Sequence, residues 1–169
     1  MSVDVTNEKR FEDDITASFL SPAGAYTHND DVYDPVLGLF PDTLIRFIQK
    51  TQPNEWRRFE LQNSGDTTRK FCLSFNNACD TYGLLDVMHH GFKHRGISFR
   101  VCYFKPESGL NQTASALYQK NEITCNRQWF YSTTFHNSVD MMIAINGIPV
   151  FAFELKNQYT GQIVDNAKR

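Results

Sequence analysis

The spacing of apolar residues predicts helices in the first half of the chain and mostly strands in the second. Through several segments before residue 90, apolar side chains recur every three to four residues, as they do on one face of a helix. Pro41 is placed to begin one of these helices, Pro53 to end it, and Gly83 to break the longest one. We therefore expect helices over residues 9–20, 41–52, 54–62 and 69–90, with further helical turns over 114–120 and 160–169.

The period changes at Ile97, from where apolar and polar residues alternate as in a half-buried strand. Three more strand-like runs follow, and the Asn146-Gly147 dipeptide between the last two is a strong signal for a tight hairpin. The strands expected are 97–103, 123–132, 139–145 and 148–155. This order predicts a single α+β domain over residues 1–169, in which helices precede and follow a small mixed or antiparallel sheet.

Composition and charge then limit the classes of function. The chain has 169 residues, with 17 Lys and Arg against 19 Asp and Glu, which gives a net charge of −2. This balance argues against a basic protein that wraps nucleic acid, but it allows a nuclease site built from carboxylates. No apolar run approaches the roughly 20 residues that span a bilayer, and the N-terminus lacks the apolar core of a secretory signal. Since the four cysteines lack zinc-site spacing, we expect reduced cysteines in a cytoplasmic protein.

The most informative chemistry lies in the last two strands. Strand alternation places Glu154 and Lys156 on one face, and Asp140 lies at the mouth of the neighbouring strand. Two converging carboxylates can hold a hard cation such as Mg²⁺, which polarises a phosphoryl oxygen and lowers the pKa of a bound water. A lysine beside that water can orient it or stabilise developing charge. This set of residues suits hydrolysis of a phosphodiester, although a solvated charge pair at a strand end remains the plain alternative.

The hairpin register provides a sharp test of that hypothesis. A regular two-residue turn would set Asp140 opposite Phe153 and leave Glu154 on the other face. The two carboxylates can meet only if the hairpin has a longer loop or a bulge of one residue, and Pro149 makes such an irregularity plausible. The apolar run 150–153 also predicts a mostly buried strand, in which an unpaired Glu154 would be costly.

Other polar residues allow two interpretations each. Gly91 and Gly96 bracket an expected loop in which Lys93 and Arg95 either contact DNA phosphates or simply belong to a charged surface. Arg127 and Gln128, on the first of the last three strands, either approach DNA and the site or support the hairpin. Three histidines near that loop are either a metal site or, more simply, solvated side chains: His89, His90 and His94.

The run from residue 118 to 156 resembles the N-terminal nuclease domain of the restriction subunit of type I restriction-modification enzymes. The residues that carry the resemblance are Asn121-Glu122-Ile123-Thr124, Asn126-Arg127-Gln128, Ser138-Val139-Asp140, Asn146-Gly147-Ile148-Pro149 and Phe153-Glu154-Leu155-Lys156-Asn157. Earlier stretches around 47–56 and 91–106 are also similar, so the resemblance covers most of the chain. It implies a restriction-endonuclease-like α/β/α fold of the PD-(D/E)xK superfamily.

The resemblance also implies function and residue roles. It makes Asp140 and Glu154 metal ligands and Lys156 the catalytic lysine, with Mg²⁺ as the cofactor and double-stranded DNA as the substrate. An acidic residue on the first helix often completes such sites, and Glu12 is the best-placed match, ahead of Asp13. The implied partners are the methylation and specificity subunits of a complex that defends against foreign DNA.

The rest of such an enzyme is expected elsewhere. The chain has no G-x-x-x-x-G-K-[ST] motif, so we expect ATP hydrolysis in a motor part of a longer subunit of which residues 1–169 are an N-terminal piece. A Gln-x-x-x-Tyr motif would lie beyond Arg169. Two alternatives stay open: a non-catalytic DNA-binding or assembly module with the same fold, and a nuclease of the same superfamily that acts in repair.

Overall fold

The computed structural model describes residues 3–22, 26–130 and 138–155, and it has the α+β composition that the sequence predicts. The helices are α1 (Val3–Phe19), α2 (Pro41–Thr51), α3 (Pro53–Gln62), α4 (Thr67–Tyr82), α5 (Leu84–His90) and α6 (Gln112–Tyr118). The strands are β1 (Phe92–His94), β2 (Ile97–Phe99), β3 (Ile123–Phe130), β4 (Ser138–Ile145) and β5 (Ile148–Phe153). The helix expected over 160–169 lies outside the described residues.

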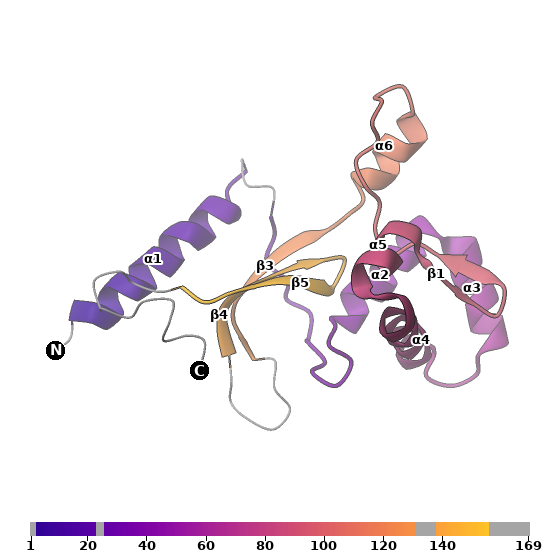
Figure 1. The fold of residues 1–169 in the computed structure, drawn as a ribbon, viewed down its shortest axis with the longest axis horizontal. Helices are drawn as coiled ribbons and strands as arrows, with labels where there is room; N and C mark the ends of the chain where they lie inside the picture. The colour runs from indigo at the N-terminus through magenta and orange to yellow at the C-terminus, as the bar shows by residue number, and fades with distance from the viewer. Residues whose placement is uncertain (1–2, 23–25, 131–137, 156–169) are drawn as a thin grey trace.

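The elements gather into two groups that lie next to each other (Figure 1). Helices α2 to α5 surround the small hairpin β1-β2, while β3, β4 and β5 form a three-stranded sheet with α1 beside it. All strand pairs in the described part are antiparallel, so a mixed sheet is not found there; the one parallel contact is an isolated bridge between Thr27 and Thr124. No helix within the described ranges is both long and apolar enough to cross a membrane.

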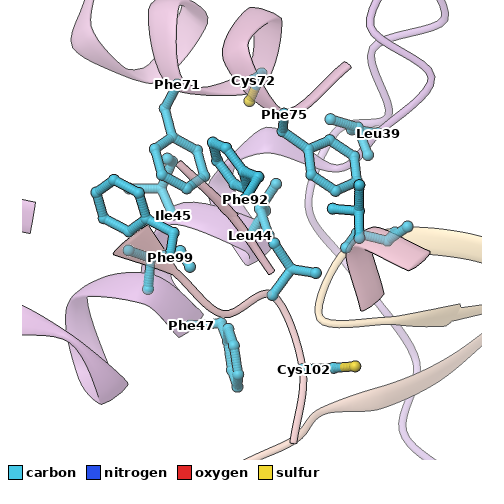
Figure 2. Close-up of a cluster of buried hydrophobic side chains, with 14 of the residues drawn as sticks. Leu39, Leu44, Ile45, Phe47, Phe71, Cys72, Phe75, Phe92, Phe99 and Cys102 are labelled. Carbon is cyan, nitrogen blue, oxygen red and sulfur yellow. The ribbon is translucent and has the colours of Figure 1, made fainter. Parts of the chain in front are cut away.

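Aromatic side chains form the centre of the helical group (Figure 2). Phe71 of α4 lies 4.9 Å from Phe99 of β2 and 5.5 Å from Phe59 of α3, in both cases edge to face, between ring centroids. Such edge-to-face pairs bury much apolar area at favourable geometry. The predicted apolar faces of α2, α3 and α4 therefore do form the core, although Leu61 (82% exposed) and Tyr82 (67% exposed) near their helix ends do not join it.

The strand predicted over 97–103 is shorter than expected, because a side chain replaces a partner strand. The Arg100 N–H donates to Oε1 of Gln52 (2.8 Å), and Nε2 of Gln52 donates to the Arg100 carbonyl (2.7 Å). The N–H and C=O groups of Arg100 thus both form hydrogen bonds without a neighbouring strand. The prediction of a loop around Lys93 is also wrong. Lys93 lies in strand β1, which is followed by a two-residue turn at Arg95 and Gly96.

The predicted hairpin turn at Asn146 is confirmed, and its side chain is fully buried. Nδ2 of Asn146 donates to the Val101 carbonyl (2.9 Å) and to Oδ1 of Asn121 (3.0 Å), while Oδ1 accepts the Glu122 N–H (2.8 Å). Its φ of 52° lies in the left-handed region, which Asn tolerates better than most residues. One residue therefore closes the hairpin and joins the sheet to the segment that follows β2.

The next residue, Gly147, brings the turn against the start of α2. Its carbonyl accepts the Phe40 N–H (2.8 Å), and its φ is 82°. A Cβ atom at this position would lie 2.6 Å from the Phe40 carbonyl oxygen and 3.0 Å from the Leu44 nitrogen, both of which are backbone atoms. Only glycine combines this conformation with so close an approach.

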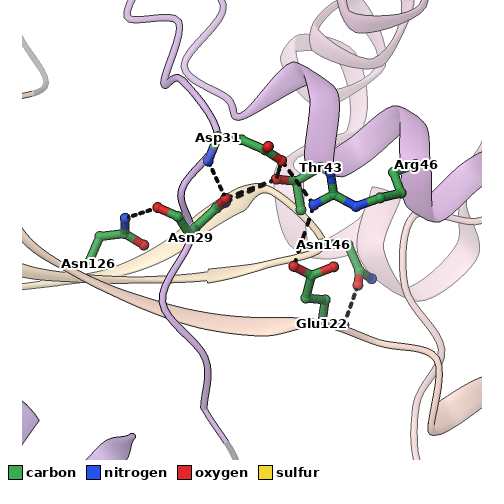
Figure 3. Close-up of polar contacts among 7 residues, drawn as sticks. All are labelled: Asn29, Asp31, Thr43, Arg46, Glu122, Asn126 and Asn146. Carbon is green, nitrogen blue, oxygen red and sulfur yellow. Dashed lines mark hydrogen bonds and ion pairs between the residues drawn. The ribbon is translucent and has the colours of Figure 1, made fainter.

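A polar network also joins α2 to the three-stranded sheet (Figure 3). The Thr43 hydroxyl donates to Oδ2 of Asp31 (2.5 Å), and Arg46 lies 2.9 Å from that oxygen. The hydrogen bond from Thr43 and the charge of Arg46 hold the pKa of Asp31 below its usual value, against the effect of burial. The remaining members connect α2 to β3 and its approach: Asn29, Glu122, Asn126 and Asn146.

The predicted reduced state of the cysteines agrees with the structure. All four thiols are free, and three of them are buried. Burial raises the pKa of Cys72 to about 12 and that of Cys102 to about 11. These side chains are unreactive parts of the core.

Replacing Asn146 by Ala should lower the free energy of unfolding by roughly 2–4 kcal/mol, because several buried backbone groups lose their partner and the turn loses a residue suited to its φ. Urea unfolding followed by circular dichroism measures this change. Asn54→Ala, an exposed asparagine on α3, is the matched control and should change stability little. Equal effects of the two substitutions would contradict the role given to Asn146.

Asp31→Asn should destabilise the protein near neutral pH, and the difference from wild type should shrink as pH falls. A carboxylate with a lowered folded pKa contributes stability above its ordinary value of 3.8, and that contribution is lost as pH falls through the folded pKa. Urea midpoints from pH 7 down to pH 3 test this. Asp30→Asn, whose side chain is 95% exposed, should show a much smaller effect. A difference that stays constant over this pH range would refute the linkage.

Candidate functional site

The hairpin β4-β5 carries a bulge of one residue, as the hypothesis of converging carboxylates requires. Ile145 pairs with Ile148 and Ala144 with Pro149, but Ile143 pairs with Phe151. Val150 is therefore the extra residue, and beyond it Met141 faces Phe153. Continued by one residue past Phe153, where β5 ends, this register would set Asp140 opposite Glu154 and on the same face of the sheet. The predicted irregularity is confirmed, and it lies next to Pro149, which has no N–H to donate to the ladder.

Asp140 is tied to the backbone immediately after Glu154. The Leu155 N–H donates to Oδ2 of Asp140 at 2.5 Å, so the carboxylate is oriented across the end of the hairpin. Asp140 is half-buried, whereas Glu154 is exposed. A hydrogen bond from a backbone N–H to one oxygen leaves the other carboxylate oxygen available for a cation.

The predicted burial of β5 before Glu154 is wrong. Phe151 is 64% exposed and Ala152 is also exposed, because β5 is the last strand of the three-stranded order in the described part of the sheet. Glu154 therefore faces solvent, and the argument that its burial would demand a partner does not apply.

Lys156 lies outside the described residues, so its role as the catalytic lysine stays a prediction. It follows Glu154 by two positions in the sequence, which would place it on the same face if the strand continued.

Arg127 of β3 binds the acidic residues of α1. Its Nη2 lies 2.6 Å from Oε2 of Glu12, and its Nη1 lies 2.5 Å from Oδ1 of Asp13. The hydrogen bond that Arg127 donates to Glu12, followed by the one that it donates to Asp13, raises the pKa of the guanidinium against the effect of burial. Arg127 therefore joins α1 to β3, which differs from the support of the hairpin that the sequence suggested. The proposed catalytic role of Glu12 and a contact of Arg127 to DNA both stay predictions.

Gln128 occupies a special position that its residue type alone did not reveal. Arg127 pairs with Met141 and Trp129 with Val139, so Gln128 lies opposite Asp140 in the register. Its φ is 47°, a conformation uncommon for a residue other than glycine. Asp140 thus has Gln128 opposite it on β3, while on its other side β5 ends one residue before Glu154.

The histidines do not form a joint site. His90 pairs with Asp86 (2.9 Å), His94 hydrogen-bonds to Ser74 (2.9 Å), and the His89 ring stacks on Phe104 with centroids 4.2 Å apart. Across the described ranges, no group of three or more His, Cys, Asp or Glu side chains is arranged to hold a metal ion. A metal at this sheet would therefore depend on the two carboxylates, water and substrate.

The other predicted DNA contacts lie in the helical group. Lys93 is exposed on β1, and Arg95 is exposed at the tip of the β1-β2 hairpin, where its φ is 44°. The structure therefore places these two cations on a different group of elements from Asp140 and Glu154 (Figure 1).

Arg127→Gln should loosen α1 while the rest of the fold remains, because one guanidinium holds two carboxylates of that helix. Hydrogen exchange measured by mass spectrometry should speed up in peptides from α1 and change little in α2 and α4. Arg57→Gln, an exposed arginine on α3, serves as the control. Unchanged exchange in α1 would show that other contacts dock this helix.

Comparison with known proteins gives no further guide to the identity of this site. No family model, no curated protein and no solved structure matches the chain. A function must therefore be argued from the bulged hairpin, the oriented carboxylate of Asp140 and the exposed carboxylate of Glu154.

Proposed function

We propose that this chain is a Mg²⁺-dependent nuclease domain that hydrolyses DNA phosphodiester bonds, of the kind found in restriction subunits of type I restriction-modification enzymes. The observation that supports the proposal is the bulge at Val150, because the shifted register, continued past Phe153, would set Asp140 opposite Glu154. A regular hairpin would have separated the two carboxylates onto opposite faces. The order of Asp140, the Asn146-Gly147 turn and the Glu154-Leu155-Lys156 run adds support from the sequence.

The residues present fit a magnesium ion. Mg²⁺ usually keeps several waters and binds through one or two carboxylates together with substrate phosphate oxygens. Asp140 and Glu154 supply two carboxylates, and the Leu155 N–H holds one oxygen of Asp140 while leaving the other available. A third protein ligand is not required for this mode of binding.

When bound, Mg²⁺ would polarise the phosphoryl group and lower the pKa of a coordinated water. Asp140 contributes an anion whose direction is set by the backbone, which reduces the reorganisation needed when substrate arrives. Glu154 contributes an exposed anion at the edge of the sheet, where a DNA strand has access. Lys156 would orient the attacking water or stabilise charge on the phosphate.

The proposed fold and partners follow from the same assignment. The sheet with α1 beside it would be the restriction-endonuclease-like core, of α/β/α type. Glu12 of α1 binds Arg127, which pairs with Met141 and so lies on the face of the sheet opposite to Asp140. With a net charge of −2, the chain is poorly suited to hold DNA alone. Methylation and specificity subunits, and a motor elsewhere in the subunit, would hold and select the DNA.

Asp140→Asn should abolish Mg²⁺-dependent nicking of supercoiled plasmid, and it should weaken Mn²⁺ binding, measured by calorimetry, by about tenfold or more. Glu154→Gln should do the same, whereas Lys156→Ala should abolish nicking with little effect on Mn²⁺ binding, because lysine is not a ligand. We expect only weak nicking by this chain alone, so the same variants are also tested in the assembled complex.

Asp30→Asn is the matched control. It removes an exposed carboxylate that is far from Asp140 in the sequence, and it should leave plasmid nicking and Mn²⁺ binding unchanged. Cleavage that survives Asp140→Asn in a folded protein would sink the catalytic assignment. Absence of both nicking and Mn²⁺ binding in wild type would favour the alternative, a DNA-binding or assembly module without activity.

A further inference from the structure

A groove of about 370 Å³ lies in the helical group, away from the proposed nuclease site. Its walls are the end of α3 with the loop that follows, one face of α4, and the tip of the β1-β2 hairpin. Lys70 and Arg95 contribute positive charge, while Ser64, Ser74 and Asn77 contribute neutral polar groups. No aspartate or glutamate lines it.

The two cations of this groove are not neutralised by neighbouring acids. Within the described residues, neither Lys70 nor Arg95 forms an ion pair. The nearby Asp66 has a different task, because its carboxylate accepts the Arg69 N–H at the start of α4. Lys70 donates to the Ser64 carbonyl, which uses one of its three ammonium hydrogens and holds the side chain over the groove. The groove therefore offers unused positive charge.

Arg95 is held at the groove by the hairpin tip and by the residue before it. The hydroxyl of Ser74 donates to the Lys70 carbonyl (2.9 Å), so its oxygen must accept the hydrogen bond from Nδ1 of His94 (2.9 Å). The His94 ring also packs edge to face on Phe59, with centroids 4.9 Å apart. His94 thus attaches the hairpin to α4, and Arg95 follows it in a tight turn with φ 44°.

We propose that this groove binds a phosphate group, with Lys70 and Arg95 as its charged contacts. The hydroxyl of Ser64 and the amide of Asn77 lie on the walls and are suited to donate to the phosphate oxygens. The phosphate belongs either to a DNA backbone or to a small free compound such as a nucleotide. This inference goes beyond the nuclease proposal and does not depend on it, because it needs neither Asp140 nor a metal.

The test compares the double variant Lys70→Gln/Arg95→Asn with Lys50→Gln/Lys105→Gln. Asn is chosen at position 95 because it tolerates left-handed φ. The control removes the same charge from exposed lysines outside the groove. Binding of a labelled DNA duplex is followed by fluorescence anisotropy, and binding of inorganic phosphate and of a nucleoside monophosphate by amide shifts in NMR spectra, all in EDTA.

The groove variant should lose about tenfold in duplex affinity at low salt, and the slope of log affinity against log salt should fall by about two, as for two lost phosphate contacts. The control should keep the wild-type slope. Amide shifts at Ser64, Ser74 and Asn77 caused by phosphate or nucleotide, and lost in the groove variant, would support the proposal with a free phosphate compound as the source.

The proposal is overturned if the groove and control variants lose equal duplex affinity and neither phosphate nor the nucleotide shifts the groove amides. Thermal unfolding shows whether each variant folds, and Lys70→Gln alone replaces the double variant if Arg95→Asn disturbs the hairpin. All these assays contain EDTA, so they require no metal at Asp140 or Glu154. A groove that binds no phosphate therefore does not contradict the nuclease proposal. In the same way, a chain without nuclease activity does not contradict phosphate binding in the groove.

Discussion

The buried turn at Asn146 and Gly147 is the constraint on which both halves of the structure depend. The side chain of Asn146 satisfies the Val101 carbonyl and the Glu122 N–H, which belong to segments on either side of α6. Gly147 allows the start of α2 to come within hydrogen-bond distance of the turn through Phe40. A tight hairpin turn is usually exposed, but here it is the joint between the sheet and the helical group, so its residues serve tertiary packing as well as local geometry.

The same turn creates the geometric problem that the bulge solves. A two-residue turn sets the ladder so that Asp140 would face Phe153, with the second carboxylate on the opposite side of the sheet. The extra residue, Val150, changes the register after Pro149, where the ladder already lacks a donor. The irregular strand thus reconciles a turn required by the fold with a pair of carboxylates required by the proposed chemistry. Bulges commonly re-aim side chains next to active sites, which agrees with this interpretation.

Features that depend on residues near in the sequence could be predicted from it. Features that depend on contacts between residues distant in the sequence could not. Pro41, Gly83 and the hairpin turn act within a few positions, so the start of α2, the break between α4 and α5 and the need for a bulge were predictable. The early end of β2 was not, because Gln52 replaces a strand partner from 48 positions away. The exposure of Phe151 was also missed, since the apolar run is the same for a central and an edge strand and only the strand order distinguishes them.

The cations of this nearly neutral chain divide into two kinds of role. Arg46 and Arg127 each lie between carboxylates from other elements, and hydrogen bonds and charge from those acids raise the pKa of both guanidinium groups. Arg46 of α2 binds Asp31 and Glu122, and Arg127 of β3 binds two acids of α1, so the charge of both arginines is paired within the fold. Lys70 and Arg95 lack such partners in the described part of the chain and face a groove without acids. A net charge of −2 therefore understates the capacity for anions, because two cations without ion pairs share one groove that has no acidic lining residue.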